Sequence, residues 1–137
     1  LRIKEHSRNA DEIAKFLMSH PKVERVSHPS VASDLAKERA DKYLSGGCGG
    51  LMGFEIKGGI EAGKQFINSL EMFYHVANIG DSRSLAIHPA STTHSQLNEE
   101  ELLSAGVTPG YVRLSIGLEH LDDIKDDLSQ ALDKVSV

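Results

Sequence analysis

The spacing of apolar residues changes repeatedly along this chain, and that change limits the folds open to it. Some stretches carry apolar residues three and four apart, as in Ala10, Ile13, Ala14 and Leu17. Others alternate strictly, as in Met52, Phe54 and Ile56. The first spacing predicts a helix with one apolar face, and the second predicts a half-buried strand. The chain is therefore expected to pack one-sided helices against a sheet.

The boundaries of these elements follow from turn residues such as Pro21 and Gly58, which interrupt the periodic stretches. We expect helices over residues 1–19, 33–44 and 60–73, and a last helix from residue 119 or 120 to residue 135. We also expect a short helix capped by Asn98, and strands over residues 23–26, 52–56, 84–87 and 111–116. This pattern predicts an α/β (α+β) fold of two layers, with helices on a small sheet. The length of 137 residues suits one domain, residues 1–137.

Composition excludes several functional classes. The formal net charge of −5 argues against nucleic-acid binding, which needs a basic face. No stretch reaches the roughly 18 apolar residues of a membrane span, and no signal peptide is visible. The single cysteine, Cys48, excludes an internal disulfide framework and suits a reducing compartment. We therefore expect a cytoplasmic protein with neither nucleic acid nor membrane as partner.

The first residues predict that the chain is cut from a longer protein. There is no initiator Met, and the helical pattern is already running by Ile3 with no clear cap residue before it. Natural helices usually carry such a cap.

Arg113 is the most informative single residue. It lies in a run that alternates, with Val112, Leu114 and Ile116 on one face and Tyr111, Arg113 and Ser115 on the other. A guanidinium in a half-buried strand needs an anionic partner, since an unpaired buried charge is costly. No acid lies within the run. The partner is either a distant carboxylate of the protein or the carboxylate of a ligand, which arginine can bind with two parallel hydrogen bonds.

Other groups of polar residues give weaker indications of function. The glycines over residues 46–50 precede a strand, whereas a phosphate-binding loop leads into a helix. Cys48 within them has no evident base nearby, and the seven histidines match no metal-ligand spacing. We expect no metal site and no catalytic triad. The loop over residues 88–95 is rich in hydroxyls and imidazoles, which suits either a binding loop or an ordinary surface loop.

Longer segments resemble a known family. Residues 78–94 read NIGDSRSLAIHPASTTH, residues 106–110 read GVTPG, and residues 112–119 read VRLSIGLE. This order resembles the C-terminal domain of the Cys/Met-metabolism enzymes, which depend on pyridoxal phosphate. The resemblance covers essentially the whole chain. Asn78 and Thr92 make it most like the O-acetylhomoserine sulfhydrylase branch; cystathionine synthases and lyases and methionine γ-lyase are the alternatives within the family.

The resemblance implies roles for three residues. Arg113 matches the family arginine that binds the substrate α-carboxylate. Asn78 falls where relatives place a serine near that carboxylate, and Thr93 matches a threonine of the same pocket. The implied reaction replaces the γ-substituent of an activated homoserine by sulfide or a thiol, in methionine and cysteine biosynthesis. The implied fold is a small antiparallel sheet covered by helices, with residues 1–19 linking it to a large preceding domain.

The same resemblance limits what this chain can do alone. The family's Schiff-base lysine follows a Ser-x-Thr motif, but here Ser91, Thr92 and Thr93 lead into His94. We therefore expect no catalytic residue, no covalently bound pyridoxal phosphate and no activity in the isolated chain. Its expected partners are an amino-acid substrate, the large domain and, at full length, the other subunits of a homotetramer. A stand-alone ligand-binding module without catalysis is the competing hypothesis.

Overall fold

Five strands form one sheet in the computed structural model, which describes residues 1–137 except for the side chain of residue 99. They are β1 (Val23–Ser27), β2 (Leu51–Ile56), β3 (Tyr74–His75), β4 (Leu85–Ile87) and β5 (Tyr111–Ser115). The order across the sheet is β1-β2-β5-β4-β3. Neighbouring strands are antiparallel except β3 and β4, which run parallel.

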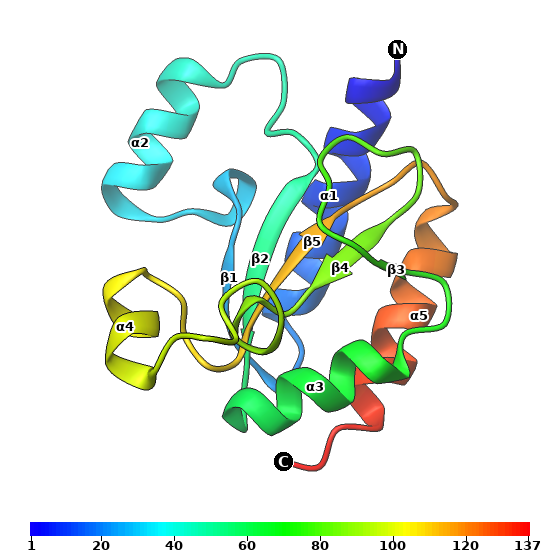
Figure 1. Cartoon of the computed structure of the whole chain (residues 1–137). Coiled ribbons are helices and arrows are strands. Elements are labelled where there is room, and N and C mark those ends of the chain that lie inside the picture. Colours follow the sequence, from blue (N-terminus) through cyan, green and yellow to red (C-terminus); the bar gives the residue numbers. More distant parts are fainter.

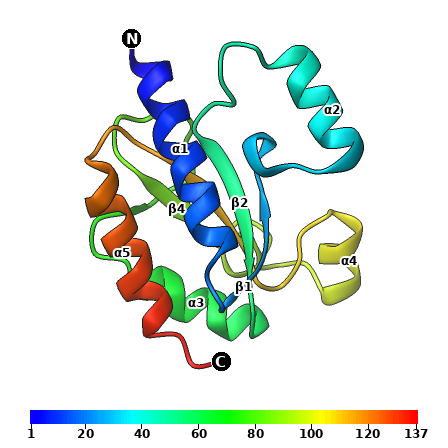
Figure 2. The same ribbon diagram turned by 180° about the vertical axis from the view of Figure 1, so that it is seen from behind.

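The helices are α1 (Arg2–Met18), α2 (Asp34–Tyr43), α3 (Gly59–Ser69), α4 (Glu99–Ser104) and α5 (Leu121–Asp133), with 3-10 turns at Pro29–Val31 and Pro89–Ser91. Helices α1, α3 and α5 cover one face of the sheet. In Figure 1, α1 runs behind the strands, and in Figure 2 it passes in front of them beside α5. Helix α2 stands away from this layer, off the β1 edge of the sheet. The predicted two-layer α/β arrangement is confirmed.

The core lies between the sheet and α1, α3 and α5. Val112, Leu114 and Ile116 of the β5 segment are fully buried, as the alternation predicts. They belong to one apolar cluster with side chains from these helices. Phe54 of β2 meets Phe66 of α3 edge to face, with ring centroids 5.3 Å apart. Each such side chain stabilises the fold by about 1.5–3 kcal/mol when fully buried.

The end of α3 differs from the prediction. The helix stops at Ser69 rather than Phe73, and Leu70 is already extended. The buried carboxylate of Asp127 on α5 accepts the backbone N–H groups of Glu71, Met72 and Phe73 at 2.8–3.1 Å. These three N–H groups therefore bond to a distant acid and not to carbonyls of α3. Strand β3, the parallel edge strand that the sequence did not predict, begins directly after this segment, at Tyr74.

The last helix begins close to the expected place, near Glu119 or His120. His120 is its N-cap, with Leu121 as the first helical residue, so Glu119 lies outside it. The predicted cap of the short helix is confirmed. The Asn98 side chain accepts the backbone N–H of Glu101, whose carboxylate accepts the N–H of Asn98.

No helix among the described residues has both the length and the apolar character needed to cross a membrane.

Candidate functional site

The face of the sheet opposite the core carries polar side chains. Arg113 of β5 pairs with Gly53 of β2 on one side and with Ile87 of β4 on the other. Residues paired across strands share a face. Arg113 is partly buried and lies at the centre of this second face, in the middle strand of the sheet.

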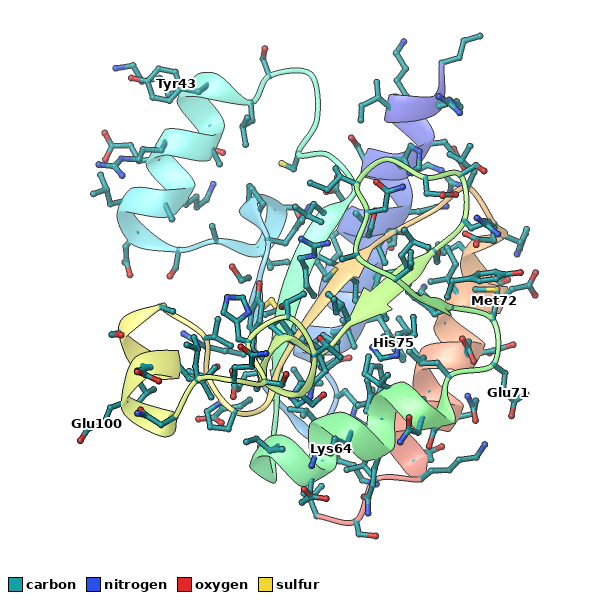
Figure 3. The ribbon with its side chains drawn as sticks, in the orientation of Figure 1. Tyr43, Lys64, Glu71, Met72, His75 and Glu100 are labelled. Atoms are coloured by element: carbon teal, nitrogen blue, oxygen red, sulfur yellow. The ribbon has the colours of Figure 1, made fainter. Side chains whose placement is uncertain are left out.

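A cavity of about 810 Å³ lies over this face. Its floor includes Arg113, Tyr111 and Gly53, and α2 supplies the opposite wall through residues that include Arg39 and Tyr43. Tyr43 is labelled on α2 in Figure 3. Arg25 of β1 adds a third guanidinium to the lining. The cavity therefore favours a ligand with negative charge.

The Arg113 guanidinium contacts a backbone carbonyl and, among the described side chains, no carboxylate. Its Nη2 donates to the backbone carbonyl of Asn78 at 3.4 Å. Among the side chains that the structure describes, no carboxylate lies within 4.0 Å of it. The carboxylates of Glu55 and Glu119 bind other partners. Glu55 receives N–H and O–H donors from Gly110 and Thr108, and Glu119 binds Ser84.

Asn78 is brought to Arg113 through its backbone. Its side chain is exposed, and Oδ1 accepts the N–H of Ile79 at 2.9 Å. The carbonyl is therefore the Asn78 group that contacts the guanidinium in this structure. The expected role of its side chain in carboxylate binding stays a prediction.

Thr93 lies in the loop that follows β4. It is exposed, and its hydroxyl is 2.8 Å from His94 Nδ1. It is not among the residues lining the cavity. Its assignment to the substrate pocket also stays a prediction.

His88, at the start of the same loop, has a structural setting. It is fully buried, with Nδ1 2.8 Å from Ser91 Oγ and Nε2 2.7 Å from the carbonyl oxygen of Pro109. Burial lowers the pKa of its imidazole, an effect that the Pro109 carbonyl partly opposes. At this position the loop is built by internal hydrogen bonds, so His88 belongs to the scaffold rather than to a solvated binding surface.

Tyr111 is a cavity residue whose position the sequence did not reveal. Its phenol lies directly over Gly53, and a β carbon at that position would collide with the ring and hydroxyl. Burial raises the pKa of Tyr111, while the nearby charges of Arg113 and Arg25 act in the opposite direction. The alternation of β5 predicted its face, but its contact with β2 depends on the strand register.

The residues around the cavity do not suit covalent attachment of pyridoxal phosphate. The described residues that line it include three arginines and no lysine, so no amine is available there for a Schiff base. Cys48 in the glycine segment is partly buried, and desolvation raises the pKa of its thiol, which disfavours the nucleophilic thiolate.

Comparison with known proteins gives consistent similarities. Residues 1–133 match the family model described as Cys/Met metabolism PLP-dependent enzyme. An O-acetyl-L-homoserine sulfhydrylase from Leptospira meyeri is 55% identical over 98% of the chain, and an L-methionine gamma-lyase from Fusobacterium nucleatum subsp. polymorphum is 43% identical over 98%. These alignments span 31% and 34% of the two relatives.

A solved structure has the same fold. It is that of a Campylobacter jejuni protein named as an O-acetylhomoserine (thiol)-lyase, with a TM-score of 0.88 and 47% identity. The match covers 96% of this chain and 31% of the Campylobacter chain, which contains a pyridoxyl-lysine monophosphate. The chain thus spans about a third of the length of the proteins that it resembles.

Proposed function

The chain belongs to the Cys/Met metabolism family of pyridoxal-phosphate-dependent enzymes, and on that premise we propose that it is the substrate-binding C-terminal domain of an O-acetylhomoserine sulfhydrylase-like enzyme. In this proposal Arg113 binds the α-carboxylate of the amino-acid substrate. Asn78 and Thr93 complete the polar surroundings of that carboxylate. The large domain and the other subunits of a homotetramer are the proposed partners.

The observation that carries this proposal is the state of Arg113. Its guanidinium lies at the floor of a cavity, touches a backbone carbonyl and has no carboxylate within 4.0 Å among the described side chains. A guanidinium in that position favours an incoming carboxylate, which it can bind through two N–H groups. Because arginine stays charged at all physiological pH values, the site is ready for an anion.

The contribution of this chain to the reaction is positioning. Pyridoxal phosphate, when bound, supplies an electron-withdrawing system to the substrate α-carbon. Holding the α-carboxylate at Arg113 fixes the orientation of that carbon and restricts its rotation. Positioning of this kind can account for a large part of a rate enhancement. The amine that would hold the cofactor is expected outside this chain.

The sulfhydrylase branch is favoured over the lyase branch by similarity. Identity to the Leptospira sulfhydrylase is 55%, against 43% for the Fusobacterium methionine gamma-lyase. The two activities have different products. With O-acetylhomoserine and sulfide, the full-length enzyme is expected to form homocysteine and acetate, whereas a γ-lyase cleaves methionine to a thiol, a 2-oxo acid and ammonia.

Substitution of Arg113 in the full-length enzyme tests the proposal. Losing a hydrogen bond to a charged group costs about 1.5–3 kcal/mol, which corresponds to a rise in KM of about 10- to 150-fold for Arg113→Ala. Cofactor absorbance is expected to persist. Arg113→Lys keeps the charge but not the paired donors and should recover only part of the loss.

Arg39→Ala is the matched control, because it removes a cationic side chain from the opposite wall of the cavity. It should raise KM less than Arg113→Ala does. An unchanged KM in Arg113→Ala would remove Arg113 from the substrate site.

A further inference from the structure

The carboxylate of Glu119 joins two segments that are distant in sequence. Oε1 accepts the backbone N–H of Ser84 at 2.6 Å, and Oε2 accepts the Ser84 hydroxyl at 2.8 Å. The Ser84 hydroxyl oxygen in turn accepts the N–H of Gly117 at 2.9 Å, and Leu118 N–H donates to the Ser82 carbonyl at 2.8 Å. These four bonds, which we call the Glu119 clamp, attach residues 82–84 to residues 117–119.

The clamp is packed and desolvated. Ser84 is fully buried. Gly117 has no space for a β carbon, because the Glu119 carboxylate and the backbone of residues 82–84 already occupy that position. Charge-assisted hydrogen bonds of this kind are stronger than neutral ones. The clamp therefore fixes the relative position of its two segments.

Helix α1 holds the clamp from the core side. The buried Asn9 side chain donates from Nδ2 to the carbonyls of Gly117 and Glu119 at 3.2 and 3.1 Å. His6 Nδ1 lies 2.6 Å from the carbonyl oxygen of Ile116. The segment after β5 is thus tied to a helix of the main core, and Glu119 extends from a fixed backbone.

The other segment held by the clamp is the loop over residues 76–84, which carries Asn78. Residues 76–80 are all exposed, so this loop buries little apolar surface of its own. A segment with few buried contacts keeps its place through specific polar attachments. Besides the clamp, the loop is held by Arg83, whose guanidinium lies 4.4 Å from the centre of the Tyr74 ring.

We infer that Glu119 is a positioning residue for carboxylate binding: it holds the 76–84 loop against the end of β5, so that the Asn78 carbonyl anchors the Arg113 guanidinium at the cavity floor. Arg113 lies on β5, a few residues before the clamp segment that follows this strand, and Asn78 precedes Ser84 on the loop. Because one N–H of Arg113 is already bonded to the Asn78 carbonyl, the Arg113 side chain loses less conformational freedom when an anion binds. This inference rests on the proposed role of Arg113.

The test compares two carboxylates of the full-length enzyme that accept backbone N–H groups. Glu119→Ala removes the clamp. Asp127→Asn weakens the buried acid on α5 that accepts the N–H groups of Glu71, Met72 and Phe73, which precede β3 and the 76–84 loop. The readouts are KM and kcat for the amino-acid substrate, the melting temperature, and hydrogen–deuterium exchange in peptides that cover residues 76–84.

Glu119→Ala is expected to raise KM about tenfold with a smaller effect on kcat, because Arg113 binds the carboxylate in the ground state as well as in the transition state. Exchange in residues 76–84 should become faster. Glu119→Gln keeps one acceptor oxygen for Ser84 and should restore part of the KM. Asp127→Asn should lower the melting temperature without raising KM.

Three comparisons decide the outcome. If Glu119→Ala leaves KM unchanged while Arg113→Ala raises it, the positioning role is wrong and the proposed function stands. If Asp127→Asn raises KM as much as Glu119→Ala does, the effect is one of general stability and the inference is also wrong. If Arg113→Ala itself leaves KM unchanged, the proposed function fails. Should Glu119→Ala not fold, Ser84→Ala removes the bridging hydroxyl and carries the same test.

Discussion

The phenol of Tyr111 occupies the space that a side chain at position 53 would need. Gly53 and Tyr111 lie on adjacent strands of the open sheet face, and a β carbon built on Gly53 collides with the Tyr111 ring and hydroxyl. Gly53 also pairs directly with Arg113. The shape of the cavity floor around the proposed carboxylate site is therefore set jointly by a residue with no side chain and by a large one.

Gly53→Ala should be destabilising on its own and tolerated when Tyr111 is made smaller. Forcing an added methyl into a packed site costs about 1–3 kcal/mol. In the double variant Gly53→Ala, Tyr111→Leu the collision is relieved, so the two changes should be non-additive by about 0.5–3 kcal/mol. Urea denaturation of the four proteins in this cycle measures the coupling. Strictly additive free energies would show that the two side chains do not share this space.

Tyr111 should ionise at a pH above the ordinary tyrosine value, because burial raises the pKa of its phenol. In a titration followed by absorbance near 295 nm, the wild type should show a step above about pH 10, the ordinary tyrosine pKa. Tyr111→Phe should remove that step. Persistence of the same step in the variant would contradict the assignment to Tyr111.

Stability should decrease as the solution is acidified below neutral pH, in part through His88. Its pKa is lowered in the folded state by burial, with Lys64 and His75 also disfavouring the imidazolium. Figure 3 shows Lys64 on α3 with His75 above that helix. The unfolded chain then binds the proton more readily, so the free energy of unfolding falls as pH drops through the ordinary histidine value of about 6.5.

The measurement compares urea denaturation at pH 7.5 and pH 5.5 for the wild type and for His88→Gln. The wild type should lose more stability between the two pH values than the variant. His20, whose pKa burial also lowers, keeps part of the dependence in both proteins. Equal losses would show that His88 does not contribute.

Asp127→Asn should destabilise the fold, because the amide of Asn has only one oxygen to accept backbone N–H groups, whereas the carboxylate has two. The Asp127 carboxylate accepts three backbone N–H groups and the side-chain amide of Gln130. Leaving a buried donor unpaired costs about 1–3 kcal/mol. Asp126→Asn, one residue away and exposed, is the control and should change stability by less than about 0.5 kcal/mol. Equal effects of the two substitutions would contradict the capping role.

Sequence patterns correctly predicted those parts of the fold that depend on residues close together in the chain. The alternation of Val112, Leu114 and Ile116 identified the buried face of β5, and a capping residue at Asn98 identified the start of α4. Strand β3 has only two residues, too few to show any period. The expected helix through Phe73 was wrong because the N–H groups of Glu71, Met72 and Phe73 bond to Asp127 in a distant helix.

The site was predicted less completely, because its contacts are non-local. The sequence identified Arg113 as a charge in need of an anion, but not that the available acids are already paired. Glu119 was expected only as a residue near the start of the last helix. Its real partner, Ser84, is 35 residues away in sequence. Only the fold brings the two together.

The last strand of the chain occupies the middle of the sheet, and this has a consequence for biosynthesis. The β1–β2 pair and the β3–β4 pair share no edge with each other, because β5 lies between them. On the ribosome, both pairs emerge before residues 111–115 do, and each then presents an open edge to solvent. Open edges promote pairing between chains. The nascent protein is therefore most exposed to pairing with other chains until β5 has been released.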